Sequence, residues 1–149
     1  MVVLSLTQPH GTIKWMYRNL DAGKGVKGLN ENFISTKGLP GHQLVRYSDG
    51  TILYPIELEA GDYEFYRWTT PEFGRYFETV NDFSVKFRSV AGRVTYIGNI
   101  ELRLLPGEKF ALIVTDMHDR DVTELTNAYR HISRDQVRTE LMRRESPNR

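Results

Sequence analysis

The chain has 149 residues, of which 40% are hydrophobic and 26% are charged, and these proportions are typical of a folded globular protein. Its 20 basic and 19 acidic residues nearly cancel, so the chain lacks the one-signed field that nucleic-acid binding requires, and no nucleic-acid partner is expected. The absence of cysteine excludes thiol catalysis, disulfides, and cysteine-bound zinc or iron–sulfur clusters. A mean hydropathy of -0.47 predicts a soluble chain with no transmembrane segment.

The N-terminal part is expected to form a strand that leads into a surface loop. The β-branched and aromatic residues of TIKWMYRNL (12–20) predict the strand, and DAGKGVKG (21–28) predicts the loop. Gly23, Gly25 and Gly28 form a GxGxxG pattern in that loop. A phosphate-binding loop of this kind is followed by a helix, and the next residues show no helical apolar stripe. The loop is therefore interpreted as exposed to solvent rather than as a dinucleotide site.

The middle of the chain shows the pattern of short strands separated by tight turns. An Asp49-Gly50 turn is expected to join two strands, and Ala91-Gly92 is expected to reverse the chain after the clear apolar and polar alternation at 83–88. Strands are predicted at 12–20, 43–47, 51–58, 63–68, 83–88, 94–98 and 110–116. This spacing predicts a mainly β fold, an antiparallel β-sandwich of about seven or eight strands.

The pattern changes to a helical one after Asp116. Asp121 is a candidate N-cap with Glu124 as its partner three residues later, and a helical apolar spacing follows at Val122, Leu125, Tyr129 and Ile132. Ser133 and Gln136 suggest a second start, with Val137, Leu141 and Met142 on one side. We therefore expect one or two short C-terminal helices. The predicted domain covers 1–132, and 133–149 is predicted to form the second short helix and a frayed polar tail.

Three polar residues between the last strand and the helix could bind a metal. Asp116, His118 and Asp119 carry hard or borderline ligand atoms in a loop position where functional groups often lie. Their spacing fits no EF-hand or zinc template, and carboxylates at this point also suit turn amides and the positive end of a helix dipole. No catalytic serine motif is present. The sequence therefore assigns no catalytic residue, no cofactor and no metal site, and keeps a metal-dependent hydrolase at these three residues as an alternative.

A dense aromatic segment is the candidate interaction patch. YRWTTPEFGRYF (66–77) interleaves rings with arginines, and aromatic residues and arginine are common anchors of protein interfaces. We call Trp68, Phe73, Arg75 and Tyr76 the aromatic patch. Some of these rings could equally fill the core of a small β domain.

Three phrases of the chain resemble a known class of domains. IELEAGDYEFY (56–66) resembles the step into a strand in transthyretin-like, or prealbumin-like, β-sandwiches. FSVKFRSVAGRVTYIGNIEL (83–102) looks like the central hairpin of small uncharacterised bacterial envelope lipoprotein domains of that class. VTDMHDRDVTEL (114–125) is similar to their closing strand, in which an Arg-Asp pair opens a C-terminal helix. The resemblance covers about residues 45–132.

The resemblance implies a non-enzymatic binding or structural domain of the cell envelope that faces the periplasm. It would recognise another envelope protein or a cell-wall component through loops at one end of the sandwich. The opening MVVLSLTQPHG shows no signal peptide and there is no lipobox cysteine. Two alternatives therefore stay open: a lipid tether on a chain whose leader was removed, or a cytoplasmic adaptor domain.

Overall fold

The computed structural model describes residues 1–8, 11–21, 31–35, 44–72, 75–78, 83–107 and 109–145. They divide into two compact units that are interleaved along the chain. Unit 1 comprises Met1–His10, Leu44–Ala60 and Ser89–Met142, and unit 2 comprises Gly11–Gln43, Gly61–Arg88 and Arg143–Arg149. The boundary expected after residue 132 thus falls inside unit 1. Of the loop that carries the GxGxxG pattern, Asp21 is described, and residues 22–30 lie outside the described residues.

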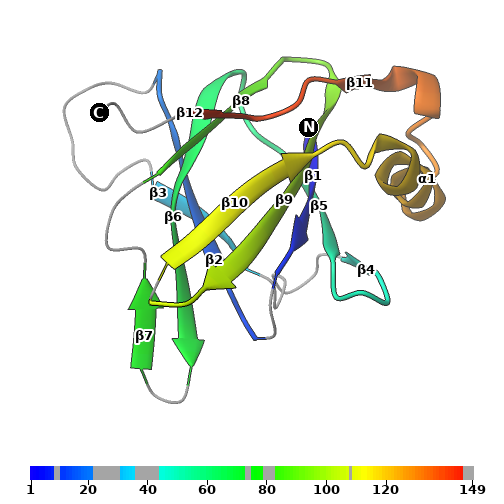
Figure 1. The fold of residues 1–149 in the computed structure, drawn as a ribbon. Coiled ribbons are helices and arrows are strands. Elements are labelled where there is room, and N and C mark those ends of the chain that lie inside the picture. The colour runs from blue at the N-terminus through cyan, green and yellow to red at the C-terminus, as the bar shows by residue number, and fades with distance from the viewer. Residues whose placement is uncertain are drawn as a thin grey trace. The chain divides into compact units, whose positions relative to one another are not determined.

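The expectation of a mainly β chain is confirmed, with more strands than the expected seven or eight. Unit 1 contains one six-stranded sheet in the order β10-β9-β1-β5-β4, with β11 paired to β9 (Figure 1). Its strands are β1 (Val2–Thr7), β4 (Val45–Arg46), β5 (Ile52–Ile56), β9 (Val94–Leu105), β10 (Lys109–Thr115) and β11 (Val137–Thr139). The sheet is mixed rather than purely antiparallel, because both β1 and β11 pair with β9 in parallel.

Strand β9 contains a β-bulge that changes which side chains share a face. Val3 and Ser5 lie two residues apart on β1, but their partners on β9, Tyr96 and Asn99, lie three residues apart. One extra residue reverses the alternation of side chains along a strand. Tyr96 and Asn99 therefore both lie on the face that carries Ser5.

Gly98 makes this bulge possible. Its φ of +102° belongs to a backbone region that residues with a Cβ rarely adopt. A Cβ at this position would lie 3.2 Å from the carbonyl oxygen of Thr115 and 3.2 Å from Cδ2 of Leu141. Strand β10 ends at Thr115, opposite Asn99. The first part of β9 pairs with β11 instead, so the bulge marks the point where β9 changes its partner on this side.

Helix α1 (His118–Ala128) packs on the face of the unit 1 sheet that carries Ser5 and Tyr96. It begins earlier than expected, with Met117 rather than Asp121 in the N-cap position. The prediction of Asp121 as the cap is wrong because this side chain lies inside the first turns of the helix and is fully buried. Buried apolar residues of the helix and the sheet form one cluster: Val3, Leu53, Tyr96, Val122, Leu125, Ile132 and Val137.

A short 3-10 helix and two strands follow α1, in place of the second α-helix expected from residue 133. The 3-10 helix covers Arg134–Gln136, and the expected Ser133–Gln136 pair is present, since the Ser133 backbone N–H donates to Oε1 of Gln136 over 2.8 Å. After the 3-10 helix the chain is extended, because its backbone donors bond to strand β9. Glu140 N–H donates to the Tyr96 carbonyl, and Met142 N–H donates to the Ile97 carbonyl.

Unit 2 contains the second six-stranded sheet, in the order β12-β8-β6-β2-β3, with β7 paired to β6. Its strands are β2 (Lys14–Asn19), β3 (Glu31–Ser35), β6 (Gly61–Glu72), β7 (Arg75–Glu78), β8 (Ser84–Ser89) and β12 (Arg143–Glu145). Aromatic rings fill its core. The rings of Phe65 and Phe87 stack with centroids 5.1 Å apart, and Trp15 meets Phe65 edge-on at 6.3 Å.

An ion pair between the partly exposed Arg18 and the buried Glu64 lies on the same sheet of unit 2. Glu64 is buried, and its Oε1 accepts a hydrogen bond from Nε of Arg18 over 2.7 Å, while its Oε2 accepts one from the Ser84 hydroxyl over 2.7 Å. The Arg18 guanidinium also lies over the ring of Tyr66, 4.5 Å from its centroid. These contacts satisfy both oxygens of a carboxylate that would otherwise be costly to bury.

Among the described residues, no helix has the length and the apolar run needed to cross a bilayer.

Candidate functional site

In unit 1, a group of hydrogen-bonded polar side chains surrounds Asp121, which has no exposed surface. Its Oδ2 accepts hydrogen bonds from the Ser5 hydroxyl over 2.5 Å and from the Tyr96 hydroxyl over 2.8 Å. Its Oδ1 accepts from the Tyr47 hydroxyl and from Nε of Arg120, each over 2.9 Å. We call these five residues the Asp121 cluster.

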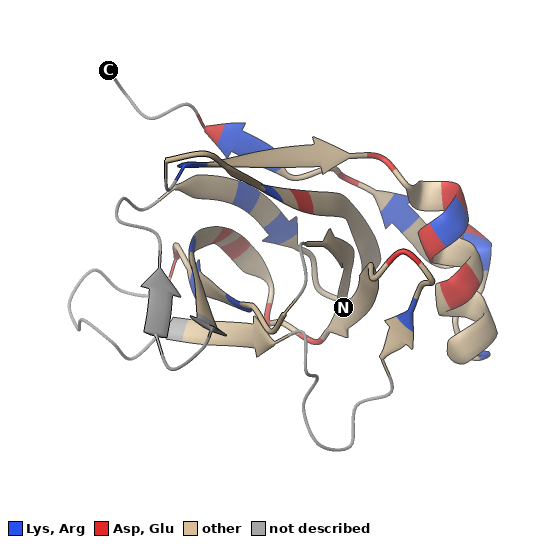
Figure 2. Ribbon diagram, turned by 60° about the horizontal axis from the view of Figure 1, so that its bottom comes forward, with Lys and Arg blue, Asp and Glu red and all other residues tan. Residues whose placement is uncertain are grey.

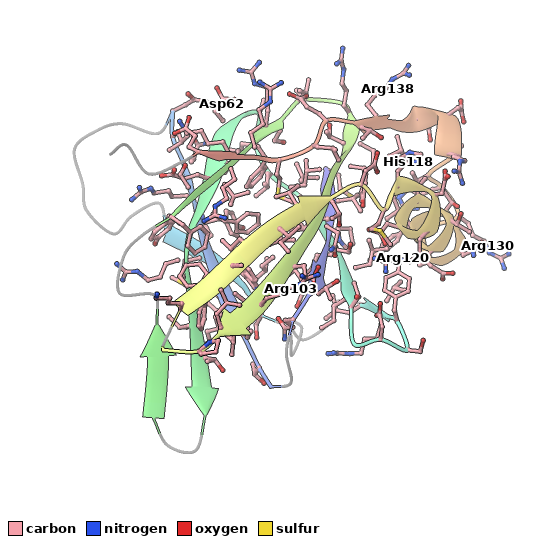
Figure 3. All side chains as sticks on the ribbon, in the orientation of Figure 1. Asp62, Arg103, His118, Arg120, Arg130 and Arg138 are labelled. Atoms are coloured by element: carbon pink, nitrogen blue, oxygen red, sulfur yellow. The ribbon has the colours of Figure 1, made fainter. Side chains whose placement is uncertain are left out.

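Four different elements bring the cluster together. Ser5 lies on β1, and the bulge in β9 turns Tyr96 toward the same face. Tyr47 follows the short strand β4, which reaches the neighbourhood of α1, and Arg120 and Asp121 are neighbours within α1. Figure 3 shows Arg120 extending from α1 toward the turn beside β4. The cluster therefore joins the helix to three strands of the sheet, at residues far apart in the sequence.

The carboxylate of Asp121 is saturated by its donors. An ionised carboxylate offers about four favourable acceptor positions. Here the hydroxyls of Ser5 and Tyr96 donate to Oδ2. The hydroxyl of Tyr47 and the guanidinium of Arg120 donate to Oδ1. A general base needs a free position to take a proton from a substrate. The arrangement therefore suits a structural anchor better than an acid–base catalyst.

The hydroxyl of Ser5 donates its proton to Asp121. It lies 2.9 Å from Oδ1 of Asn99 as well as 2.5 Å from Asp121, but a hydroxyl has a single proton to donate. The charged and closer oxygen of Asp121 is the stronger acceptor. Rotating the side-chain amide of Asn99 by 180° exchanges its oxygen and nitrogen without changing its shape. Nδ2 would then donate to the Ser5 hydroxyl, and both Ser5 and Asn99 would have a partner. Ser5 is then not available as a nucleophile.

Burial and the charge of Asp121 keep the two tyrosines protonated. Desolvation is the largest cause that raises the pKa of Tyr96 far above its ordinary value, and the negative charge of Asp121 and the hydrogen bond to it raise this pKa further. The same causes raise the pKa of Tyr47, and the neighbouring Arg120 opposes the shift. Both hydroxyls therefore remain hydrogen-bond donors throughout the physiological pH range.

The expected Asp49-Gly50 turn is confirmed, and it supports the outer side of the cluster. Asp49 Oδ1 accepts from the Thr51 backbone N–H over 2.8 Å, and Gly50 has a φ of +84°. Asp49 Oδ2 also lies 3.6 Å from Nη1 of Arg120. The guanidinium of Arg120 stacks on the Tyr47 ring, 4.2 Å from its centroid, so Arg120 is held from several directions.

The three candidate metal ligands line one depression of unit 1, and Nδ1 of His118 lies 3.4 Å from Oδ1 of Asp119. Asp116 accepts a hydrogen bond from the His118 backbone N–H over 2.9 Å, as a turn aspartate does. Asp119 has a side chain that is 92% exposed and pairs with Arg134. The ring of His118 lies edge-on to Tyr96, with centroids 5.7 Å apart. In the part of the chain that the structure describes, no three His, Cys, Asp or Glu side chains are placed to hold a metal ion.

The residues of the aromatic patch have different environments. Trp68 lies on β6 opposite Trp15 and is only 6% exposed, so it belongs to the core of unit 2. Arg75 and Tyr76 lie on β7, and their side chains, like the whole of Phe73, lie outside the described residues. The patch stays a prediction for these three residues, but the structure does not present Trp68 as a surface anchor.

Comparison with known proteins adds no relative. No protein-family model matches the chain, and neither the curated proteins nor the solved structures include a significant match.

Sequence reasoning missed the Asp121 cluster. Ser5 and Tyr96 lie on different strands and Tyr47 follows a third, and no local spacing connects them with residue 121. The one local signal was a serine at position 5 within an apolar strand, where a polar residue needs a buried partner. The identity of that partner depends on the sheet order and on the bulge.

Proposed function

We propose that this chain is a non-enzymatic binding domain of the bacterial cell envelope, of the transthyretin-like sandwich class, which recognises another protein through a loop at the end of a sheet. The observation that carries the proposal is a pair of adjacent exposed leucines. Leu104 and Leu105 end strand β9 and are 54% and 44% exposed. We call this pair the hairpin tip. Exposed apolar groups at a loop are a common feature of protein-binding surfaces.

The backbone around the hairpin tip holds the two leucines in defined positions. Pro106 and Gly107 form the turn that follows, and Gly107 has a φ of +74°, which suits a tight reversal. Leu104 pairs directly with Phe110 across the two strands, and Leu105 pairs with Lys109. Neighbouring side chains alternate between the faces of a strand, so the two leucines project on opposite sides of the hairpin.

The non-enzymatic part of the proposal is supported by the chemistry of the Asp121 cluster. Ser5 and Asp121, which most resemble a catalytic pair, are bonded to each other, and the carboxylate of Asp121 also accepts hydrogen bonds from two tyrosine hydroxyls. At the alternative metal-dependent site, Asp116, His118 and Asp119 line one depression, but no three such side chains are placed to hold a metal ion among the described residues. A protein is favoured over a cell-wall component as the ligand because an exposed leucine on each side of the hairpin offers apolar contact and few hydrogen bonds.

The test is site-specific photocrosslinking in the source cells with a photoreactive residue at position 104. A matched control carries the same residue at position 20, where Leu20 is also exposed, at 36%, but lies in unit 2. We expect an adduct of one defined mass at position 104 and none at 20. The identified partner, purified, should then bind the native chain and lose affinity for Leu104→Ser/Leu105→Ser. Equal binding of this variant would exclude the hairpin tip as the recognition surface.

Localisation is tested separately by fractionating cells and measuring the intact mass of the native protein. An envelope fraction and an N-terminal diacylglyceryl cysteine are expected for a tethered domain. An unmodified chain in the cytoplasm would contradict the envelope part of the proposal and favour a cytoplasmic adaptor, while leaving the hairpin tip to be judged by the crosslinking result.

A further inference from the structure

A second feature of unit 1 lies at the end of the sheet where β9 begins. A depression of about 630 Å³ is lined there by Glu57, Arg93, His131, Gln136 and Arg138, among others. We call it the cationic pocket. It contains two arginines and a histidine but only one carboxylate, that of Glu57. This excess of cationic over anionic groups contrasts with α1, which carries the acidic residues Asp119, Asp121 and Glu124 beside the one arginine Arg120 (Figure 2).

The two arginines come from neighbouring segments at the start of β9. Arg138 lies on β11 directly opposite Thr95 of β9, and the two strands are parallel. Arg93 immediately precedes β9, at the end of the turn that leads into this strand. Both side chains line the same depression. Both guanidinium groups can therefore converge on one ligand.

Both arginines have their charge available. Arg93 and Arg138 are exposed, and neither forms an ion pair with the residues that the structure describes. Arg138 also lowers the pKa of Asp135, but the hydrogen bond of Asp135 with the Ser133 side chain is the larger cause of that shift. The remaining carboxylate at the pocket, Glu57, is exposed and screened by water.

We propose that the cationic pocket binds a phosphate group. A planar guanidinium donates two parallel hydrogen bonds to phosphate oxygens, and two guanidinium groups in one depression match the charge of a phosphate better than that of a single carboxylate. His131 adds a further donor at the rim. The phosphate could belong to a soluble ligand or to a lipid headgroup. This inference rests on the pocket alone and does not depend on the hairpin tip.

The test measures binding of inorganic pyrophosphate by calorimetry and of phosphatidylglycerol vesicles by co-sedimentation, with phosphatidylcholine vesicles as the neutral reference. Arg138→Gln and Arg93→Gln should each weaken binding about tenfold, since each removes a charged hydrogen-bond donor. Glu57→Gln should strengthen binding, because it removes the opposing charge. Arg130→Gln is the matched control: Arg130 is exposed on unit 1 and, in Figure 3, lies beside α1 and away from Arg138.

Each outcome decides the proposal. Binding of pyrophosphate that is lost in the pocket variants would identify a soluble phosphate ligand, and binding of the anionic vesicles with the same dependence would identify a headgroup. Equal weakening by Arg130→Gln would show a general charge effect and overturn the pocket. Absence of binding to both probes would overturn it as well. Unchanged melting temperatures of the variants would show that the differences do not arise from unfolding.

Discussion

Tyr96 joins the sheet of unit 1 to the start of helix α1 through Asp121. Its hydroxyl donates to Oδ2 of Asp121 over 2.8 Å and accepts a hydrogen bond from the backbone N–H of Met117 over 3.1 Å. Met117 is the N-cap residue of α1, so one phenol satisfies both a side chain inside the helix and one of its N-terminal amides. This link takes the place of the aspartate cap that the sequence pattern predicts.

The first prediction concerns the two tyrosines of the Asp121 cluster. Tyr96→Phe should lower the free energy of unfolding by about 1–3 kcal/mol, because it leaves the Met117 amide and one acceptor position of the buried Asp121 without this partner. Tyr47→Phe should cost less, since Tyr47 is only half-buried and water can replace its hydroxyl. Urea unfolding followed by tryptophan fluorescence measures both values. A larger effect at Tyr47 would contradict the assignment of Tyr96 as the central donor.

The second prediction concerns alkaline pH. Folding raises the pKa of Tyr96 and of Tyr47 above the ordinary tyrosine value of 10.0, so the unfolded chain loses these protons first. The stabilisation is fully present below pH 10.0 and is lost as the pH rises above it toward the folded-state values. Each tyrosine should lower the free energy of unfolding by about 1.4 kcal/mol per pH unit in that window.

The measurement is thermal unfolding between pH 9 and 12, with ultraviolet absorbance to follow tyrosine ionisation. The double variant Tyr47→Phe/Tyr96→Phe is the control, because its stability should fall less steeply with pH in the same range. Equal slopes for the native chain and the double variant would show that the two hydroxyls do not ionise later in the folded state.

The third prediction concerns the bulge. Gly98→Ala should destabilise the protein by about 1–3 kcal/mol, because a Cβ is strained at this positive φ and would crowd a backbone oxygen. Gly50→Ala is a control for backbone strain alone, since Gly50 also has a positive φ but nothing lies within 4 Å of its Cβ position. Chemical denaturation compares the two. A smaller cost at Gly98 than at Gly50 would show that the bulge relaxes around the added methyl group.

The fourth prediction separates core from surface in unit 2. Trp68→Ala should destabilise the protein by about 3–5 kcal/mol, because it removes a buried indole. Phe33→Ala should have a much smaller effect, since Phe33 is 42% exposed. Melting temperatures of the two variants provide the comparison. A native melting temperature for Trp68→Ala would return this residue to the aromatic patch as a surface anchor.

Seven strands were predictable because their signals are local, but β1 (Val2–Thr7) and β3 (Glu31–Ser35) were not predicted. Alternation at 83–88 and the Asp49-Gly50 turn depend on neighbouring residues, and the structure contains both β8 and the turn. The helix start was not predictable in the same way. Asp121 has the composition of an N-cap, but burial against Ser5 and Tyr96 determines its place inside α1. Tertiary contacts override capping preference at this point.

The C-terminal segment and the candidate site depend on pairing between distant residues. Val137 has a helical spacing with Leu141, yet it lies on β11 because β9 offers a strand edge that the sequence pattern does not reveal. The Asp121 cluster likewise requires the β9 bulge, which a single glycine at position 98 signals only weakly. Sheet order and register would have to be known before either feature could be derived.

The buried carboxylate of Asp121 is a structural anchor, and its donors Ser5, Tyr47 and Tyr96 hold α1 on the sheet. Urea unfolding of Asp121→Asn tests it most directly, with the exposed Asp119→Asn as the matched control. Asp121→Asn should lose about 3–5 kcal/mol, because it breaks a buried charged network, while Asp119→Asn should lose no more than about 1 kcal/mol. Equal stability of Asp121→Asn and the native chain would contradict the claim and reopen the cluster as a functional site.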